Sequence, residues 1–168
     1  MAPIHDAAHR ANATVLQQLL ESGVSPDAID SPADRRTPLH LLCRSRSACM
    51  NGDRAACFEL LRDAGANLEA SDSKGLRPLH FAAERGKKKM VSLLVQARVN
   101  VDATANHNAT ALHLAARSSR RGAPDCVEVL LAAGADMDAR TSAGRRPFEL
   151  AIINVAPTHR SRRMWPLF

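Results

Sequence analysis

The sequence is poor in aromatic residues. Its 168 residues include four Phe, one Trp and no Tyr, so aromatics make up only 3% of the chain. Hydrophobic residues nevertheless reach 45%, and they are mostly Ala, Leu and Val. This composition favours helices with small contact residues over a β-sandwich.

Long apolar runs are also missing. No run approaches the roughly 18–20 residues that a helix needs to cross a bilayer. The first residues, MAPIHDAAHR, lack the charged and then apolar regions of a secretory signal. These absences predict an intracellular chain, cytoplasmic or nuclear, whose four cysteines are reduced thiols: Cys43, Cys49, Cys57 and Cys126.

Motifs of catalysis are absent as well. The sequence contains no nucleophile motif, no Gly-rich phosphate loop and no HExxH pair. Scattered carboxylates such as Asp136 and Asp138 fall within the turn sequence GADMDA. We therefore predict that the chain is not an enzyme and needs no cofactor.

What the chain does contain is a repeat. The stretch RPLHFAAERG beginning at Arg77 recurs as TALHLAARSS at Thr110 and RTPLHLLCRS at Arg36. The equivalent anchor positions lie 35, 40, 33 and 36 residues apart, at Pro3, Pro38, Pro78, Ala111 and Pro147. A Leu-rich second segment follows in the first four copies: VLQQLLESG, FELLRDAG, MVSLLVQAR and VEVLLAAG.

The local chemistry of each copy predicts two short helices. Pro at a first helical position has no N–H to leave unpaired, and Thr37 and Thr110 stand where a hydroxyl can cap the helix. Gly at the end of a second segment is typical of a left-handed cap. One such helix pair cannot bury its own apolar face, but stacked pairs bury one another's.

The strings TPLH, ALHLAA, LLRDAGANLEA and LLAAGADMDA resemble ankyrin repeats over about residues 2–154. The resemblance implies an all-α ankyrin-repeat solenoid of stacked antiparallel helix pairs with β-hairpin finger connectors. We expect units near 2–34, 35–75, 76–108 and 109–144, a partial unit at 145–154, and a basic C-terminal tail at 155–168.

Several positions depart from the pattern. Arg77 and Arg146 occupy the Thr cap position, and Arg98 occupies the Gly position, where we expect a left-handed backbone. Units two and four carry insertions between their helices. In the last unit we expect a helix over about 147–154, after which Trp165, Leu167 and Phe168 fold back over unit four.

Two groups of metal-binding residue types invite a zinc hypothesis, and we reject both. His5, His40, His80 and His113 share one repeat position, so they lie a repeat apart instead of converging on one ion. The resemblance implies that this His bonds to backbone and Thr at the base of the finger. The spacing of Cys43, Cys49 and Cys57 does not match the usual close pairs, so no metal site is predicted.

The distribution of Lys and Arg is the one pattern that the repeat itself does not account for. The inter-helix turns are expected to line up on the edge opposite the fingers, and many Lys and Arg fall there. Besides Arg44, Arg85 and Arg117, this basic edge comprises Arg46, Arg54, Lys87, Lys88, Lys89, Arg120, Arg121, Arg160, Arg162 and Arg163. The edge is either an ordinary solvated surface or a docking site for an acidic protein surface, nucleic acid or anionic lipid.

The resemblance implies a binding surface made of finger tips and first-helix faces, on the concave side. Mapped onto this sequence, its residues are Asp34, Arg35, Arg44, Ser45, Ser73, Lys74, Leu76, Glu84, Arg85, Asn106, His107, Ala109, Arg117 and Ser118. The predicted function is a non-catalytic, monomeric protein-binding module that serves as a scaffold or adaptor. Electrostatic docking to nucleic acid or anionic membrane is the alternative, and the sparse aromatics disfavour base stacking.

Overall fold

The structure is a computed structural model that describes residues 2–45 and 54–153. Within these ranges the chain forms nine α-helices and one 3₁₀ turn, with no β-strand. The prediction of an all-α fold is confirmed. No helix in the described ranges is long and apolar enough to span a membrane. The insertion at 46–53 and the tail beyond residue 153, including the predicted fold-back of Trp165, Leu167 and Phe168, lie outside the described residues.

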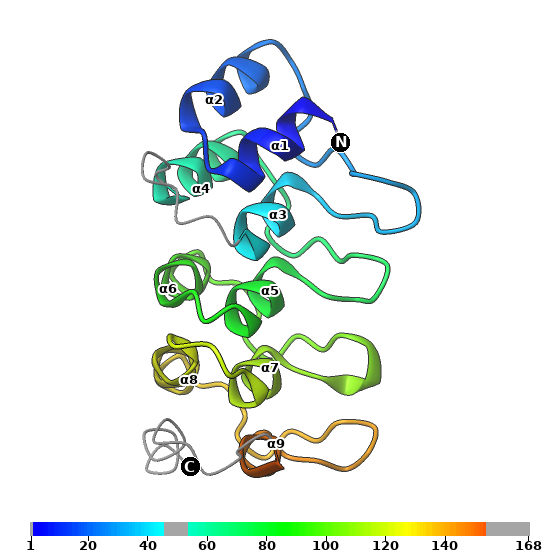
Figure 1. The fold of residues 1–168 in the computed structure, drawn as a ribbon, viewed down its shortest axis with the longest axis vertical. Helices are drawn as coiled ribbons and strands as arrows, with labels where there is room; N and C mark the ends of the chain where they lie inside the picture. Colours follow the sequence, from blue (N-terminus) through cyan, green and yellow to red (C-terminus); the bar gives the residue numbers. More distant parts are fainter. Residues whose placement is uncertain (1, 46–53, 154–168) are drawn as a thin grey trace. The chain divides into compact units, whose positions relative to one another are not determined.

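The chain divides into two compact units. The first covers Met1–Pro78 and contains α1 (Pro3–Arg10), α2 (Ala13–Glu21), α3 (Pro38–Arg44) and α4 (Arg54–Asp63). Helix α1 packs on α2 and α3, and α4 packs on α2 and α3, so two helix pairs lie against each other (Figure 1). Their fully buried side chains include Ile4, Leu16, Leu39, Leu42, Phe58 and Leu61.

The second unit covers Leu79–Phe168. Helix α5 (Pro78–Glu84) begins at its boundary and is followed by α6 (Lys88–Gln96), η1 (Asn106–Asn108), α7 (Ala111–Arg117), α8 (Ala123–Ala132) and α9 (Pro147–Ile153). Helix α8 packs on α6 and α7, and α7 also packs on α9. The core includes Leu94, Leu112 and Leu130 together with small side chains at Ala82, Ala83, Ala115 and Ala116.

The first helix of each pair begins where the sequence predicts. Helices α1, α3, α5 and α9 start at Pro3, Pro38, Pro78 and Pro147, and α7 starts at Ala111. The backbone N–H of Thr37 donates to Nδ1 of His40 at 3.1 Å, and Nε2 of the same ring donates to the Leu76 carbonyl at 3.0 Å. His113 makes the corresponding bonds to Thr110 and to the Arg145 carbonyl. The predicted structural role is thus observed for His40 and His113, whereas for His5 and His80 the ring Nε2 bonds to a backbone carbonyl.

The connectors are hairpin loops that we call fingers (Figure 1). A backbone hydrogen bond closes each base: Asp30 N to Arg36 O, Asp72 N to Leu76 O, Ala105 N to Ala109 O and Thr141 N to Arg145 O. Within each unit, one finger also bonds to the next, because Ser73 N donates to Asp34 O at 2.9 Å and Ser142 N donates to His107 O at 2.8 Å. Within each unit, these bonds fix adjacent fingers to one another.

Candidate functional site

In the first unit, the exposed candidate residues lie on two adjacent fingers. Arg35, Ser73 and Lys74 are exposed, and Leu76 is half-buried. Arg35 has a left-handed backbone with φ of 56°, which directs the chain around the tip of its finger. The bond between Ser73 N and Asp34 O holds these two tips together, so their side chains form one continuous polar surface.

A network of ion pairs, which the sequence analysis did not predict, joins residues of these two fingers. Nη2 of Arg36 lies 3.2 Å from Oδ1 of Asp34, and Nε of Arg36 lies 3.7 Å from Oδ2 of the buried Asp72. Asp72 also accepts hydrogen bonds from the backbone N–H groups of Lys74 and Leu76, at 2.8 and 2.9 Å. The sequence offers one signal for this network, the Asp at the start of the turn in SDSKG. This signal does not identify Arg36 as the partner of that Asp.

The α3 end of the first unit needs one correction. Arg44 is the last residue of α3 and is half-buried. Ser45, which we predicted to contact a partner, is buried with 0% of its surface exposed. The chain leaves α3 at Ser45, whose N–H bonds to Leu41 O, and the residue turns inward. Ser45 is therefore a structural position in this conformation and is removed from the candidate surface.

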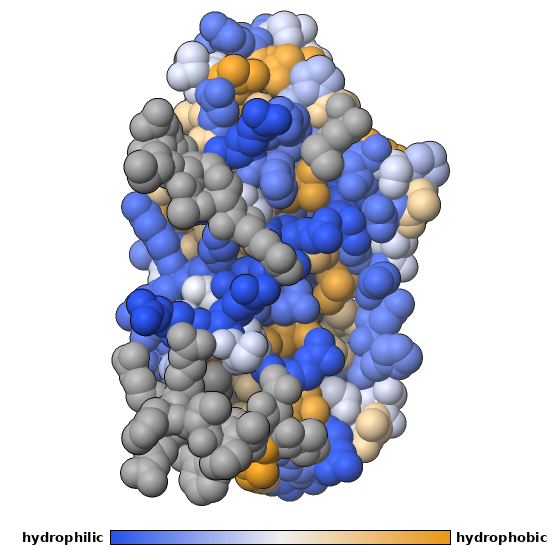
Figure 2. Space-filling model, in the orientation of Figure 1, coloured by the Kyte–Doolittle hydropathy of each residue, from blue (hydrophilic) through white to orange (hydrophobic). Residues whose placement is uncertain are grey.

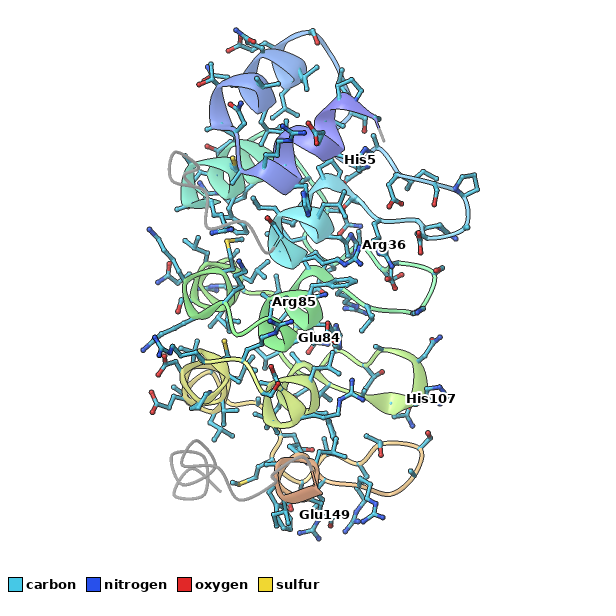
Figure 3. The ribbon with its side chains drawn as sticks, viewed as in Figure 1. His5, Arg36, Glu84, Arg85, His107 and Glu149 are labelled. Atoms are coloured by element: carbon cyan, nitrogen blue, oxygen red, sulfur yellow. The ribbon has the colours of Figure 1, made fainter. Side chains whose placement is uncertain are left out.

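In the second unit, the candidate residues lie at a finger tip and at the ends of two first helices (Figure 3). Asn106 and His107 are exposed on the finger, and His107 has a φ of 62°. Ala109 is half-buried at the base of the finger, and Arg117 is exposed at the end of α7. Ser118 has a structural bond, since its hydroxyl donates to the Glu84 carbonyl at 2.7 Å.

Glu84 and Arg85 are neighbours at the end of α5 (Figure 3). Nε of Arg85 lies 4.0 Å from Oε2 of Glu84, and the Arg85 side chain is only 17% exposed. Arg85 therefore offers little surface to a partner, whereas Glu84 is 41% exposed. We call the exposed and half-buried candidates, without Ser45, the finger surface of each unit.

The structure describes only part of the predicted basic edge. Arg54 is half-buried at the start of α4, and Lys87 is half-buried before α6. Lys88, Lys89, Arg120 and Arg121 are exposed in the second unit. Arg46, Arg160, Arg162 and Arg163 lie outside the described residues. The described members of the basic edge are distributed over the two compact units, and each unit is considered by itself.

Thiols and metal-ligand types do not form a reactive centre in the described part of the chain. Cys43, Cys57 and Cys126 are buried and form no disulfide with one another. Burial raises the pKa of Cys126 to about 12; the charge of Asp125 also raises it, whereas Lys88 acts in the opposite direction. No cluster of three or more His, Cys, Asp or Glu side chains with metal-binding geometry occurs within residues 2–45 and 54–153.

Comparisons with known proteins agree with this arrangement. The family description "Ankyrin repeats (3 copies)" matches residues 46–141, and "Ankyrin repeat" matches residues 1–31. The chain is 31% identical over 153 residues to human "SH3 and multiple ankyrin repeat domains protein 2", covering 91% of this chain and 8% of that protein. It is 34% identical over 152 residues to "Putative E3 ubiquitin-protein ligase XBAT31" of Arabidopsis thaliana, covering 83% and 31%.

A shorter relative is covered to a greater extent. The chain is 35% identical over 116 residues to human "Ankyrin repeat domain-containing protein 37", covering 68% of this chain and 66% of that protein. The chain thus spans less than a third of the two longer relatives and about two thirds of this one. What all three share with it is the repeat region.

Proposed function

Because this chain belongs to the ankyrin repeat family, whose repeats are generally protein–protein interaction modules, we propose that it is a non-catalytic scaffold or adaptor. In this proposal a partner protein binds to the finger surface of one or both units. The partner's identity and the activities of the longer relatives are not transferred to this chain, since fold alone does not determine a ligand.

The observation that carries the proposal is the combination of exposed side chains and a fixed backbone. Arg35, Lys74 and His107 are exposed, but their fingers are closed by backbone bonds and linked to neighbouring fingers. An ordered loop loses less conformational entropy on association than a flexible one. Exposed polar groups on ordered loops are therefore well suited to bind a partner at low entropic cost.

The finger surface also offers mixed charge. Asp34 and Lys74 lie on neighbouring fingers in the first unit, and Glu84 and Arg117 lie at the ends of α5 and α7 in the second. Mixed charge favours selection of a partner by complementary pairs, which affects specificity and association rate more than affinity.

The test is to identify partners by affinity capture with mass spectrometry, and then to measure the binding of each purified partner by calorimetry. The first-unit variant Arg35→Ala/Lys74→Ala and the second-unit variant His107→Ala/Arg117→Ala remove exposed finger-surface side chains. Arg10→Ala/Arg62→Ala and Gln96→Ala/Arg98→Ala remove exposed side chains elsewhere and serve as matched controls.

We expect at least one finger-surface variant to weaken binding by tenfold or more, an effect of about 1.4 kcal/mol, while both controls bind normally. Thermal melting would show that each variant is folded. If the controls lose binding and the finger-surface variants keep it, the partner binds elsewhere and the proposal is wrong.

A further inference from the structure

Two inter-helix turns of the second unit touch each other. A Cβ atom added at Gly122 would lie 2.1 Å from the Gly86 carbonyl oxygen, so the two backbones meet with no room for a side chain. The Ser118 hydroxyl also donates to the Glu84 carbonyl at 2.7 Å. The turn that links α5 to α6 is therefore fixed against the turn that links α7 to α8.

Four exposed cationic side chains lie in or beside these two turns. Lys88 and Lys89 open α6, and Arg120 and Arg121 stand just before α8. We call these four residues the turn cluster. Lys88 is close enough to α8 for its charge to act on the Cys126 thiol there. The surface over the two turns is mostly hydrophilic (Figure 2).

Acidic side chains in the described ranges do not neutralise the turn cluster. The helix ends nearby act in opposite directions, because the starts of α6 and α8 carry partial positive charge and the ends of α5 and α7 carry partial negative charge. None of its four side chains forms an ion pair with an acidic residue in the described ranges. Of the nearest acids, Glu84 faces Arg85 and Asp125 lies in the first turn of α8. The four cations therefore repel one another without a described ion pair, and an anionic ligand would reduce that repulsion.

We propose that the turn cluster binds an acidic, extended segment of a partner protein. An extended peptide rises about 3.3 Å per residue, so a few consecutive carboxylates can span two adjacent turns. Guanidinium groups such as those of Arg120 and Arg121 bind carboxylates in bidentate fashion. The four residues of the turn cluster do not belong to the finger surface, although Glu84, Arg85, Arg117 and Ser118 of that surface adjoin them. The proposal does not require the finger surface to be occupied.

The chemistry of the turns favours a peptide over two other polyanions. Residues 85–89 and 117–122 include no aromatic side chain on which single-stranded bases could stack. The exposed large hydrophobic residues of the described chain are Val15, Ile29, Met137 and Ile152. None of them lies in these turns, so no large apolar side chain within residues 2–45 and 54–153 is placed to enter a bilayer beside the cations.

The experiment uses the full chain and a fluorescein-labelled oligoglutamate peptide, with binding followed by fluorescence anisotropy. The cluster variant is Lys88→Gln/Lys89→Gln/Arg120→Gln/Arg121→Gln. The matched control, Arg10→Gln/Arg62→Gln/Arg98→Gln/Arg140→Gln, removes the same charge from exposed positions outside the cluster. Single-stranded oligonucleotides and phosphatidylserine vesicles are tested in parallel.

We expect the cluster variant to bind oligoglutamate about tenfold more weakly than the wild type, with the control retaining most of its affinity. The cluster variant should also melt at the same temperature as the wild type or higher, since repulsion among the four cations is removed and no described ion pair is lost. Equal weakening in both variants would show a general charge effect and overturn the proposal. Cluster-dependent binding of oligonucleotide or vesicles that is tighter than peptide binding would overturn the choice of partner.

Discussion

At the scale of single residues, Arg98 shows the clearest conflict between side chain and backbone. Its φ of 59° is left-handed, as predicted, and it occupies the position that Gly23, Gly65 and Gly134 fill in the other copies. A left-handed backbone costs a non-Gly residue about 1–2 kcal/mol. Part of this cost is offset because Gly makes the unfolded chain more flexible.

We therefore expect Arg98→Gly to raise the free energy of unfolding by about 0.5–1 kcal/mol, as measured by chemical denaturation. The reciprocal control is Gly65→Ala. A Cβ atom at Gly65 would meet nothing within 4 Å, so this change tests the backbone alone and should destabilise. A lower midpoint for Arg98→Gly would contradict the left-handed assignment.

The buried histidines make a prediction about pH. Burial lowers the pKa of His40 and of His113 below the ordinary value of 6.5. Protonation would also place an N–H at Nδ1, where His40 accepts from Thr37 N. Both rings thus remain neutral in the folded chain over a range in which the unfolded chain takes up protons.

Since the folded pKa is the lower one, the stabilising contribution is complete above about pH 6.5 and falls as the pH drops toward the folded pKa. The free energy of unfolding should decrease by at most about 1.4 kcal/mol per pH unit for each ring. Urea denaturation at about pH 7.5 and 5.5 measures this, and NMR titration of the rings, assigned with His40→Gln and His113→Gln, identifies the groups. Ring pKa values of 6.5 or higher in the folded protein would exclude this mechanism.

At the scale of helices, the two Arg residues at cap positions form ion pairs with acidic residues. Arg77 pairs with Glu69, and Nη1 of Arg146 lies 3.1 Å from Oδ1 of Asp138. Each acid lies eight residues before its Arg, on the preceding connector. The cap hydrogen bond that Thr110 makes at the start of α7 is thus replaced by an ion pair at the surface.

We predict that Arg146→Thr stabilises α9. Thr three residues before Glu149 would complete a capping box, and a good N-cap contributes about 0.5–2 kcal/mol. The lost ion pair with Asp138 contributes only about 0.2–1 kcal/mol, so the net gain should be roughly 0.5 kcal/mol. Thermal unfolding tests this. The control Asp138→Asn removes the ion pair alone and so measures its contribution to stability. If that contribution exceeds the contribution of a good N-cap, Arg146→Thr should destabilise the protein instead, contrary to the prediction.

The helices themselves were readable from the sequence because their signals are local. Pro at a helix start, Thr before it and a left-handed residue at a helix end each act within a few positions, and the helix boundaries follow them. The interactions that shape the surface are not local. Arg36 lies near Asp72, and Gly122 contacts Gly86. In both pairs the two residues are 36 positions apart in the chain. The repeat predicts that such positions are neighbours, but not which side chains pair or that Ser45 turns inward.

At the scale of the whole molecule, charge is the property that the repeat does not explain. The net charge is +6, and four of the cations gather in the turn cluster of the second unit. In water, two like charges about 10 Å apart repel by about 0.4 kcal/mol before screening. Compact states with excess charge are destabilised by such repulsion, and salt reduces it.

We therefore expect moderate NaCl to raise the free energy of unfolding of the wild type by roughly 1 kcal/mol relative to low salt. The variant Lys88→Gln/Lys89→Gln/Arg120→Gln/Arg121→Gln should show a smaller increase because the clustered repulsion is already gone. Arg10→Gln/Arg62→Gln/Arg98→Gln/Arg140→Gln carries the same net charge but keeps the cluster, so it should retain most of the salt effect. Urea denaturation in NaCl of about 50 mM and 0.5 M measures all three proteins. If the two variants respond equally to salt, net charge and not its placement governs stability, and the turn cluster has no special energetic cost.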